Sequence, residues 1–164
     1  MTTDGVRNVV ESDAAVICDI YNHYVAHTII TFEQEPVSIS EMRSRIRETA
    51  AQYPWLVSDS GQGLVAYAYA SRWRSRAAYD QTVETTVYVR SDATGSGIGL
   101  PLYMTLLDEL RRRSVHAAVG CIALPNPGSV AFHEKCGFQK VAHFPQVGRK
   151  FDQWVDVGFW QVLL

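Results

Sequence analysis

Cysteine, methionine and long apolar runs are scarce in this chain of 164 residues. Its three cysteines, Cys18, Cys121 and Cys136, stand in unrelated contexts, and no CxxC pair suggests a redox or zinc motif. The polar start MTTDGVRNVV lacks the features of a signal peptide, and no apolar run reaches the roughly 18 residues that a membrane span requires. We therefore expect reduced thiols, a cytoplasmic protein and no contact with a membrane.

A strong excess of one charge sign is also missing. The formal net charge is -2 at pH 7, with 20% charged and 47% hydrophobic residues, as in an ordinary globular protein. Because a nucleic-acid surface normally carries a basic excess, this balance favours small-molecule partners and no nucleic acid. The length suits a single domain over residues 1–164, without an internal repeat or an interdomain linker.

The most informative stretch is VYVRSDATGSGIG at residues 87–99, where a β-branched strand runs through a polar turn into alternating glycines and an apolar helix. Gly95, Gly97 and Gly99 lack a Cβ, so the backbone can adopt positive φ and approach a ligand closely. The first N–H groups of a helix lack internal partners and lie at its positive end. A Rossmann fingerprint would need glycine in place of Leu100, and a Walker Gly-Lys-Ser/Thr is absent. The junction predicts a diphosphate site; the alternative is a loop that merely turns the chain.

Apolar spacing, caps and turns outline the other elements. Ser12 is the expected N-cap of a first helix, and Ser38 with Glu41 gives a capping-box signature for a second. Strands are expected at residues 55–59, 64–70, 82–89, 115–122, 138–144 and 154–164, and the first two should form a hairpin. One helix is expected to follow the glycine loop and to end at residues 111–113. A shorter helix is expected to begin at Asn126 and to end at Gly137. The order is strand, two helices, three strands, helix, strand, helix, two strands, which predicts an α/β fold with a mixed sheet.

This layout, with VYVRSDATGSGIG and NPGSVAFHEKCGF, resembles the GNAT superfamily of acyl-CoA-dependent N-acyltransferases over nearly the whole chain. The stretches TFEQEP, RWRSRAAYDQTVETTVYV, ALPNPGSVAFHEKCGF and KFDQWVDVGFWQ resemble phosphinothricin acetyltransferases and the related methionine sulfone or sulfoximine acetyltransferases. The resemblance implies a GNAT-type mixed, mostly antiparallel central sheet flanked by helices. It also implies a homodimer, acetyl-CoA as co-substrate, and direct attack by the acceptor amine in a ternary complex, without an acetylated enzyme or a metal.

The resemblance also implies which residues hold acetyl-CoA. These are Val87, Tyr88 and Val89 beside the pantetheine, the amides of Gly95, Ser96, Gly97, Ile98, Gly99 and Leu100 on the pyrophosphate, and Asn126 and Ser129 on the pantetheine side. Asn126 also suits a purely structural N-cap. The chain departs from the family at Thr94, where Arg or Gln is usual, and at Ser96, where a basic residue is frequent. Because backbone amides do most of the phosphate binding, we expect weakened rather than abolished affinity.

Two residues are candidates for proton transfer, because an amine near pH 7 is mostly ammonium and needs a base before it can attack a carbonyl. Glu84 interrupts the apolar alternation of its strand, so it points to the opposite face from Val83 and Thr85, and it matches the family's TVE position. His133 stands where many members carry a tyrosine that protonates the departing thiolate, and it suits an acid or a second base. The structural alternatives are a solvated strand carboxylate and a polar histidine on a helix face.

The acceptor site is expected in two loops. Arg76 offers a guanidinium fork for a carboxylate or phosphinate, and the resemblance places it, with Ala77 and Tyr79, near the substrate. Phe32 would form an apolar wall. The alternatives are a solvated arginine loop and core packing of Phe32. His23 and His27 have the spacing of a helical metal pair, but no HExxH or further ligand cluster accompanies them, so no metal is expected.

The sequence thus predicts an acetyl-CoA-dependent N-acetyltransferase for the α-amine of a small amino acid analogue, such as phosphinothricin, methionine sulfoximine or methionine sulfone. Detoxification would be the consequence. One alternative is a GNAT enzyme for another amine, such as a polyamine, an aminoglycoside or a protein N-terminus; a cationic acceptor would want acidic pocket residues, whereas the motif offers arginines. The others are a non-catalytic acyl-CoA-binding module and a nucleotide-binding protein that uses the loop for ATP or NAD.

Overall fold

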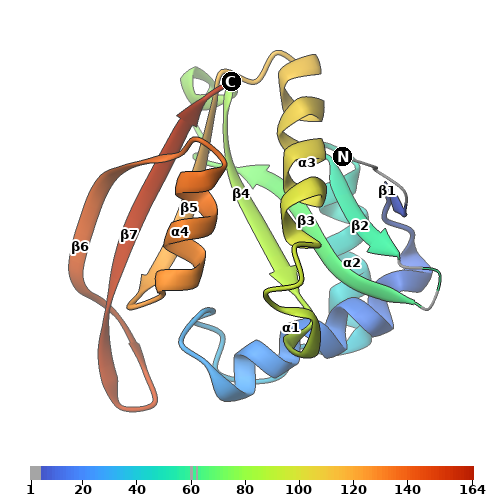
Figure 1. The fold of residues 1–164 in the computed structure, drawn as a ribbon, viewed down its shortest axis with the longest axis horizontal. Coiled ribbons are helices and arrows are strands. Elements are labelled where there is room, and N and C mark those ends of the chain that lie inside the picture. The colour runs from blue at the N-terminus through green and yellow to red at the C-terminus, as the bar shows by residue number, and fades with distance from the viewer. Residues whose placement is uncertain (1–4, 60, 62) are drawn as a thin grey trace.

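Seven strands form one mixed sheet in the order β1-β2-β3-β4-β5-β7-β6 (Figure 1) within the part of the chain that a computed structural model describes, residues 5–59, 61 and 63–164. The strands are β1 (Val6–Asn8), β2 (Trp55–Asp59), β3 (Leu64–Arg72), β4 (Thr82–Val89), β5 (Ala117–Leu124), β6 (Gln139–Lys150) and β7 (Gln153–Leu163). Neighbouring strands are antiparallel except β4 and β5, which are parallel. The predicted sheet type and the hairpin of the second and third strands are confirmed.

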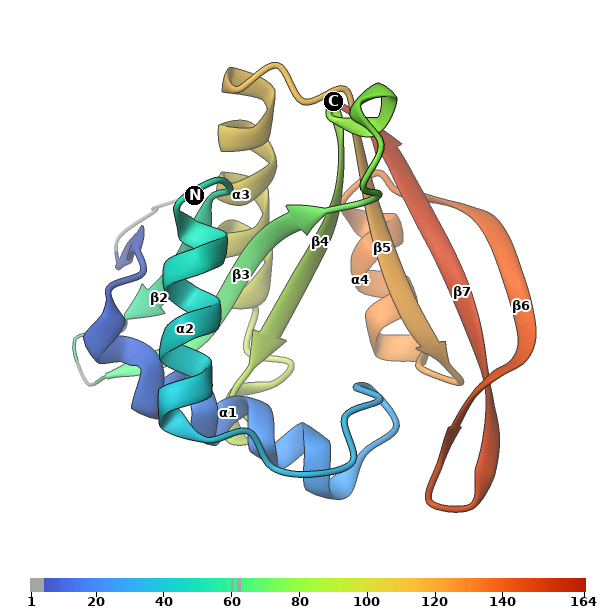
Figure 2. The ribbon, with the colours of Figure 1, turned by 180° about the vertical axis from the view of Figure 1, so that it is seen from behind.

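Helices cover both faces of the sheet. They are α1 (Ala14–His27), α2 (Ile39–Ala50), α3 (Gly99–Arg112) and α4 (Pro127–Lys135), with short 3-10 turns η1 (Glu11–Asp13), η2 (Ala77–Tyr79) and η3 (Ser91–Ala93). The helices α3 and α4 lie on one face, and α1 with α2 on the other (Figures 1 and 2). The predicted order of elements is confirmed. No helix in the described ranges is both long and apolar enough to span a bilayer.

Each face of the sheet buries its own hydrophobic core. On the α3 side, Leu102, Leu106 and Leu110 are fully buried against the inward residues of β3 to β5, as their helical spacing predicts. On the other side, Ile17 and Ile46 of α1 and α2 pack against β2 and β3. Removing each such side chain from water stabilises the fold by about 1.5–3 kcal/mol, so the two cores hold the sheet rigidly between them.

The starts of the first two helices differ from the prediction. Ser12 is not the N-cap of α1, because residues 11–13 form a 3-10 turn and Asp13 is the residue before the helix. The Asp13 carboxylate instead accepts from the Val10 N–H at 2.9 Å. At α2, Ser38 Oγ accepts from the Glu41 N–H at 3.1 Å, which confirms the cap. The Glu41 carboxylate binds Arg45 at 3.0 Å, so only half of the expected box forms.

Two strand boundaries were predicted wrongly. The strand expected at 115–122 is β5 at 117–124, because the chain first bonds through the His116 N–H to the Gln81 carbonyl oxygen. The strand expected at 138–144 continues as β6 to Lys150, although Pro145 and Gly148 are poor strand residues. Pairing with β7 carries β6 past them through an irregular register between Phe144 and Gly148. The result is a long hairpin that reaches beyond the rest of the sheet (Figure 1).

Candidate active site

The strands β4 and β5 pair briefly and then part. Their parallel register joins residues 82–84 to 117–119, and in the described chain no further pair follows although both strands continue. A cavity of about 260 Å³ lies where they separate. Its walls come from β4, β5, α4 and the loop at residues 28–36, which we call the 28–36 loop. The opening between two parallel strands therefore creates the site.

Glu84 lines this cavity from β4. Val83 and Thr85 are buried on the opposite face, and the Thr85 hydroxyl lies 2.7 Å from that of Tyr103 in α3, so the predicted alternation is confirmed. Burial raises the pKa of the Glu84 carboxyl, and the positive charge of Arg74 opposes this shift. The carboxylate is therefore a better proton acceptor than a solvated one.

The helix α4 brings a histidine to the same cavity. Asn126 Oδ1 accepts from the Ser129 N–H at 3.1 Å, which confirms the N-cap. His133 Nδ1 lies 2.8 Å from the Ser129 carbonyl oxygen; because a carbonyl can only accept, Nδ1 carries the hydrogen and Nε2 is the free basic nitrogen. The side chain is 4% exposed, so it is no surface histidine. Burial lowers its pKa, although the bond to Ser129 opposes this, and the imidazole is therefore mainly neutral near pH 7.

The glycine loop leads from β4 to α3 in the conformation that its glycines permit. Gly95 and Gly97 have φ of +76° and +85°. Gly99 does not adopt positive φ; it begins α3, and a Cβ there would lie 3.3 Å from Val89 Cγ2 and 3.5 Å from Phe132 Cε2. The third glycine thus lies in a closely packed place against β4 and α4 and does not serve a left-handed backbone conformation.

Main-chain amides of this loop are available to a ligand. Among the N–H groups of residues 95–97, the described chain provides a carbonyl partner only for Ser96, at 3.4 Å from Ala93. The hydroxyls turn inward: Thr94 Oγ1 donates to the Ser91 carbonyl at 2.9 Å, and Ser96 Oγ donates to that of Ala93 at 2.5 Å. The hydroxyls of Thr94 and Ser96 thus bind within the loop and shape it. The geometry fits an anion held by amides.

The structure brings only part of the predicted site together. Phe32, Glu84, Val87, Tyr88, Asn126, Ser129 and His133 all line the cavity. Phe32 is 38% exposed, so core packing does not describe it. Val89, the last residue of β4, and residues 95–100 are not among the residues that line the cavity. Arg76 and Tyr79 line a separate hollow of about 380 Å³ with Arg74 and Ser75, and Ala77 lies in η2 between them.

Sequence reasoning missed the wall that β5 supplies, namely Cys121, Ile122 and Ala123, as well as Tyr69 from β3. A continuous apolar strand does not reveal which of its residues faces a cavity, because that depends on where its neighbour departs. Burial and the Glu84 carboxylate raise the pKa of the Cys121 thiol to about 11. The thiol therefore stays protonated near neutral pH and is a poor nucleophile, which fits direct transfer to the acceptor.

The histidine pair on α1 is not part of this site. The rings of His23 and His27 lie 5.1 Å apart, centroid to centroid. Within the residues that the structure describes, three or more His, Cys, Asp or Glu side chains nowhere gather as a metal site would require.

A mixed sheet that opens between two parallel strands, beside a glycine loop at a helix N-terminus, defines an acyl-CoA-dependent acyltransferase fold. The family model for the acetyltransferase (GNAT) domain matches residues 6–158. The chain therefore belongs to the GNAT acetyltransferase family, whose enzymes use acetyl-CoA.

Individual relatives place the chain within one branch of that family. Phosphinothricin N-acetyltransferase of Streptomyces coelicolor is 39% identical over 160 residues, which cover 95% of this chain and 94% of that protein. The L-methionine sulfoximine/L-methionine sulfone acetyltransferase of Pseudomonas aeruginosa is 34% identical over 97% of this chain and 94% of its own. A crystal structure of phosphinothricin acetyltransferase from Sinorhizobium meliloti in complex with acetyl-CoA has a TM-score of 0.93 and 32% identity, covering 97% and 87% of the two chains. The resemblance to this branch is thereby confirmed.

Proposed function

We propose that this protein transfers the acetyl group of acetyl-CoA to the α-amine of a small amino acid analogue. Phosphinothricin, methionine sulfoximine and methionine sulfone are the acceptors that we expect, with detoxification as the consequence. The observation that carries the proposal is the single cavity in which Glu84 and His133 face the gap between β4 and β5. The named activities of the relatives support the choice of acceptors.

The chemistry requires two protons to leave the acceptor nitrogen. Glu84 takes the first from the ammonium, directly or through water, and the free amine then attacks the thioester carbonyl carbon. As the new C–N bond forms and the C–S bond breaks, CoA leaves as a thiolate. His133 Nε2 carries no hydrogen at neutral pH, so it accepts the second proton before passing it to that thiolate. His133 is thus a base first and an acid afterwards.

Binding divides between main chain and side chains. The amides of residues 95–100 would hold the diphosphate of CoA, and Val87–Val89, Asn126 and Ser129 would flank the pantetheine. Phe32 would contact the acceptor side chain. Arg76, Ala77 and Tyr79 are proposed to contact the acceptor carboxylate, which the influence of the neighbouring Arg74 on the Glu84 carboxyl supports.

We further propose a homodimer in the cytoplasm. Exposed apolar side chains on β6 and β7, among them Val141, Val147 and Trp154, support an interface between two copies. The free thiols of Cys18, Cys121 and Cys136 suit a reducing compartment.

The direct test combines enzyme, acetyl-CoA and one acceptor at a time, and measures released CoA thiol and the N-acetylated product by mass spectrometry. We expect release with the three amino acid analogues. Release only with polyamines, aminoglycosides or peptide N-termini would replace the acceptor class. Tight CoA binding with negligible turnover, unchanged in Glu84→Gln, would indicate a binding module. Thermal stabilisation by ATP but not by desulfo-CoA would indicate a nucleotide-binding protein.

A further inference from the structure

A buried lysine lies behind the cavity and takes no part in the proposed chemistry. Lys150, the last residue of β6, is 2% exposed, and its Nζ donates to the Thr31 carbonyl oxygen at 2.7 Å. Burial lowers its pKa, and the charge of Glu33 opposes this shift. The ammonium also lies 5.0 Å from the centroid of the Phe151 ring, and neither of these two partners is charged. A buried ammonium with only neutral direct partners is a poor way to stabilise a fold, because leaving water is costly for it. The contact therefore points to a role in placing Thr31.

Thr31 belongs to the segment of the 28–36 loop that forms a wall of the cavity, together with Ile30 and Phe32. Its hydroxyl lies 2.7 Å from Tyr21 Oη in α1. Thr31 is therefore held by α1, near the N-terminus, and by β6, near the C-terminus. The Lys150 contact spans 119 positions in sequence.

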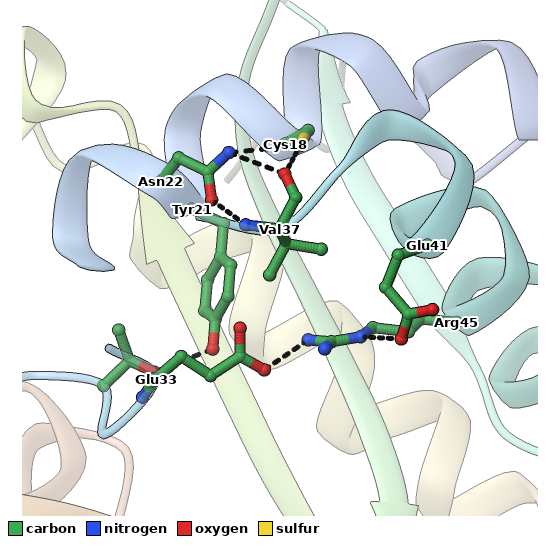
Figure 3. Close-up of polar contacts among 8 residues, drawn as sticks. Cys18, Tyr21, Asn22, Glu33, Val37, Glu41 and Arg45 are labelled. Atoms are coloured by element: carbon green, nitrogen blue, oxygen red, sulfur yellow. Dashed lines mark hydrogen bonds and ion pairs between the residues drawn. The ribbon is translucent and has the colours of Figure 1, made fainter. Parts of the chain in front are cut away.

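The remainder of the 28–36 loop is held from the side of α1 and α2 (Figure 3). Arg45 of α2 binds Glu33 at 2.7 Å. The Asn22 side chain of α1 makes two hydrogen bonds to the main chain of Val37. Its Oδ1 accepts from the Val37 N–H at 2.8 Å, and its Nδ2 donates to the Val37 carbonyl oxygen at 2.9 Å. These contacts fix the loop after Thr31, whereas Thr31 itself is held by Tyr21 of α1 and by Lys150 of β6.

Gly148 makes a second contact between β6 and this wall. It lies two positions before Lys150, so both residues face the same side of the strand, and both are buried while Arg149 between them is exposed. A Cβ at Gly148 would overlap the ring of Phe32. The Phe32 ring therefore occupies its present place only because residue 148 has no side chain.

We propose that Lys150 and Gly148 are positioning residues that set the acceptor-facing wall of the cavity. The Lys150 ammonium fixes Thr31, and Gly148 leaves room for the Phe32 ring because it has no side chain. Together they determine which acceptor side chains fit. This inference rests on the proposed function, since it takes the cavity as the acceptor site. It assigns a role in acceptor selection to a hairpin that contributes neither base nor cofactor contact.

Lys150→Met tests the ammonium, because it removes the donor and the charge while keeping a long aliphatic side chain. We expect the acceptor KM to rise about tenfold with the acetyl-CoA KM unchanged, and the Tm not to fall. Lys140→Met, on the same strand but exposed, is the matched control and should change neither KM. An unchanged acceptor KM in Lys150→Met, or a fall in Tm with both KM values altered together, would overturn the positioning role.

Gly148→Ala tests the second contact through a double-mutant cycle with Phe32→Ala. We expect Gly148→Ala to shift the ratio of kcat/KM between methionine sulfone and phosphinothricin, whose side chain has the same length but carries a phosphinate charge, and to lose that effect when Phe32 is already alanine. An equal effect in both backgrounds would contradict the proposed contact.

Hydrogen exchange keeps the inference independent of activity. Residues 28–33 should exchange faster in Lys150→Met than in the wild type, with α1 unaffected. If the wild type acetylates none of the acceptors, the proposed function fails while this measurement still decides the anchoring. Unchanged exchange in that segment would show that Lys150 does not hold the loop.

Discussion

Glu84 and His133 receive opposite pKa shifts from the same physical cause. Burial disfavours the charged form of each, which raises the pKa of the carboxyl and lowers that of the imidazole. Both changes suit proton acceptance near neutral pH: the carboxylate holds a proton more firmly, and the imidazole is not already protonated. In the proposed mechanism, these are the two acceptors for the two protons that amide formation releases.

Glu84→Gln is expected to lower kcat by about 10²–10⁴, the usual contribution of a positioned base. In the wild type, kcat/KM should fall as the pH drops through the raised pKa of Glu84, because the protonated carboxyl cannot accept. Initial rates across pH at saturating acetyl-CoA check this, and the limb should be absent in the variant. A variant with wild-type kcat would assign the base elsewhere.

Glu84→Gln should lower activity but raise the stability of the fold. A carboxyl whose pKa is raised by folding makes the native state less stable as pH rises from its ordinary value of 4.5 through the raised value. Glu84→Gln removes this penalty, so the variant should have a higher Tm than the wild type at pH 7 and a smaller advantage at pH 4. Thermal denaturation at both pH values measures the difference.

Gly120 on β5 determines where the His133 ring lies. A Cβ there would stand 2.7 Å from His133 Cδ2 and 2.8 Å from Nε2. Gly120→Ala should therefore displace the ring, lower kcat and destabilise the fold by about 1–3 kcal/mol, as overpacking does. Gly128→Ala in α4 is the control, because its Cβ would meet only Asn126 Oδ1, at 4.0 Å. This substitution should stabilise the fold by about 0.5–1 kcal/mol. Urea denaturation and kcat measured on both variants separate the two outcomes.

At the scale of elements, the glycine loop and the start of α3 form the proposed site for the diphosphate of CoA. Gly97→Ala meets no atom within 4 Å, so its effect is purely conformational at a φ of +85°. Strain of about 1–2 kcal/mol should raise the acetyl-CoA KM about five- to thirtyfold and leave the acceptor KM unchanged. Gly61→Ala, at a φ of +78° in open space far from β4's end in sequence, should leave both constants unchanged. Equal effects from the two variants would show that the loop strain is not specific to CoA binding.

At the scale of the whole molecule, the long hairpin of β6 and β7 carries six of the twelve large hydrophobic side chains that are exposed among the described residues. Its exposed side chains are Val141, Phe144, Val147, Phe151, Trp154 and Leu163. Val147→Asp should shift the proposed dimer toward monomer, because a charge in an apolar interface loses its hydration. Sedimentation velocity over a range of concentrations checks this. Ile39→Asp, an equally apolar exposed site at the start of α2, should leave the mass unchanged, and a wild-type monomer at all concentrations would remove the dimer proposal.

The sequence predicted elements well wherever local chemistry decides. The cap at Ser38, the cap at Asn126 and the glycine loop depend on neighbouring residues, and all three form as expected. The prediction failed at Ser12 and at the end of β6. At the start of α1, Asp13 takes the place expected for Ser12, and its carboxylate is bound by Arg7. At the end of β6, pairing with β7 continues the strand past Pro145.

The candidate site shows the same division. Glu84 could be predicted from strand alternation, because the two faces of a strand follow directly from its period of two. The wall from β5, the burial that shifts two pKa values and the reach of Lys150 to Thr31 depend on residues distant in sequence. The amino-acid sequence by itself determined the order of the elements, the glycine loop and the family, since these follow from local conformation and motif spacing. Only the tertiary structure decided where β4 and β5 part and what lines the opening, because burial and long-range contact exist only once the sheet is assembled.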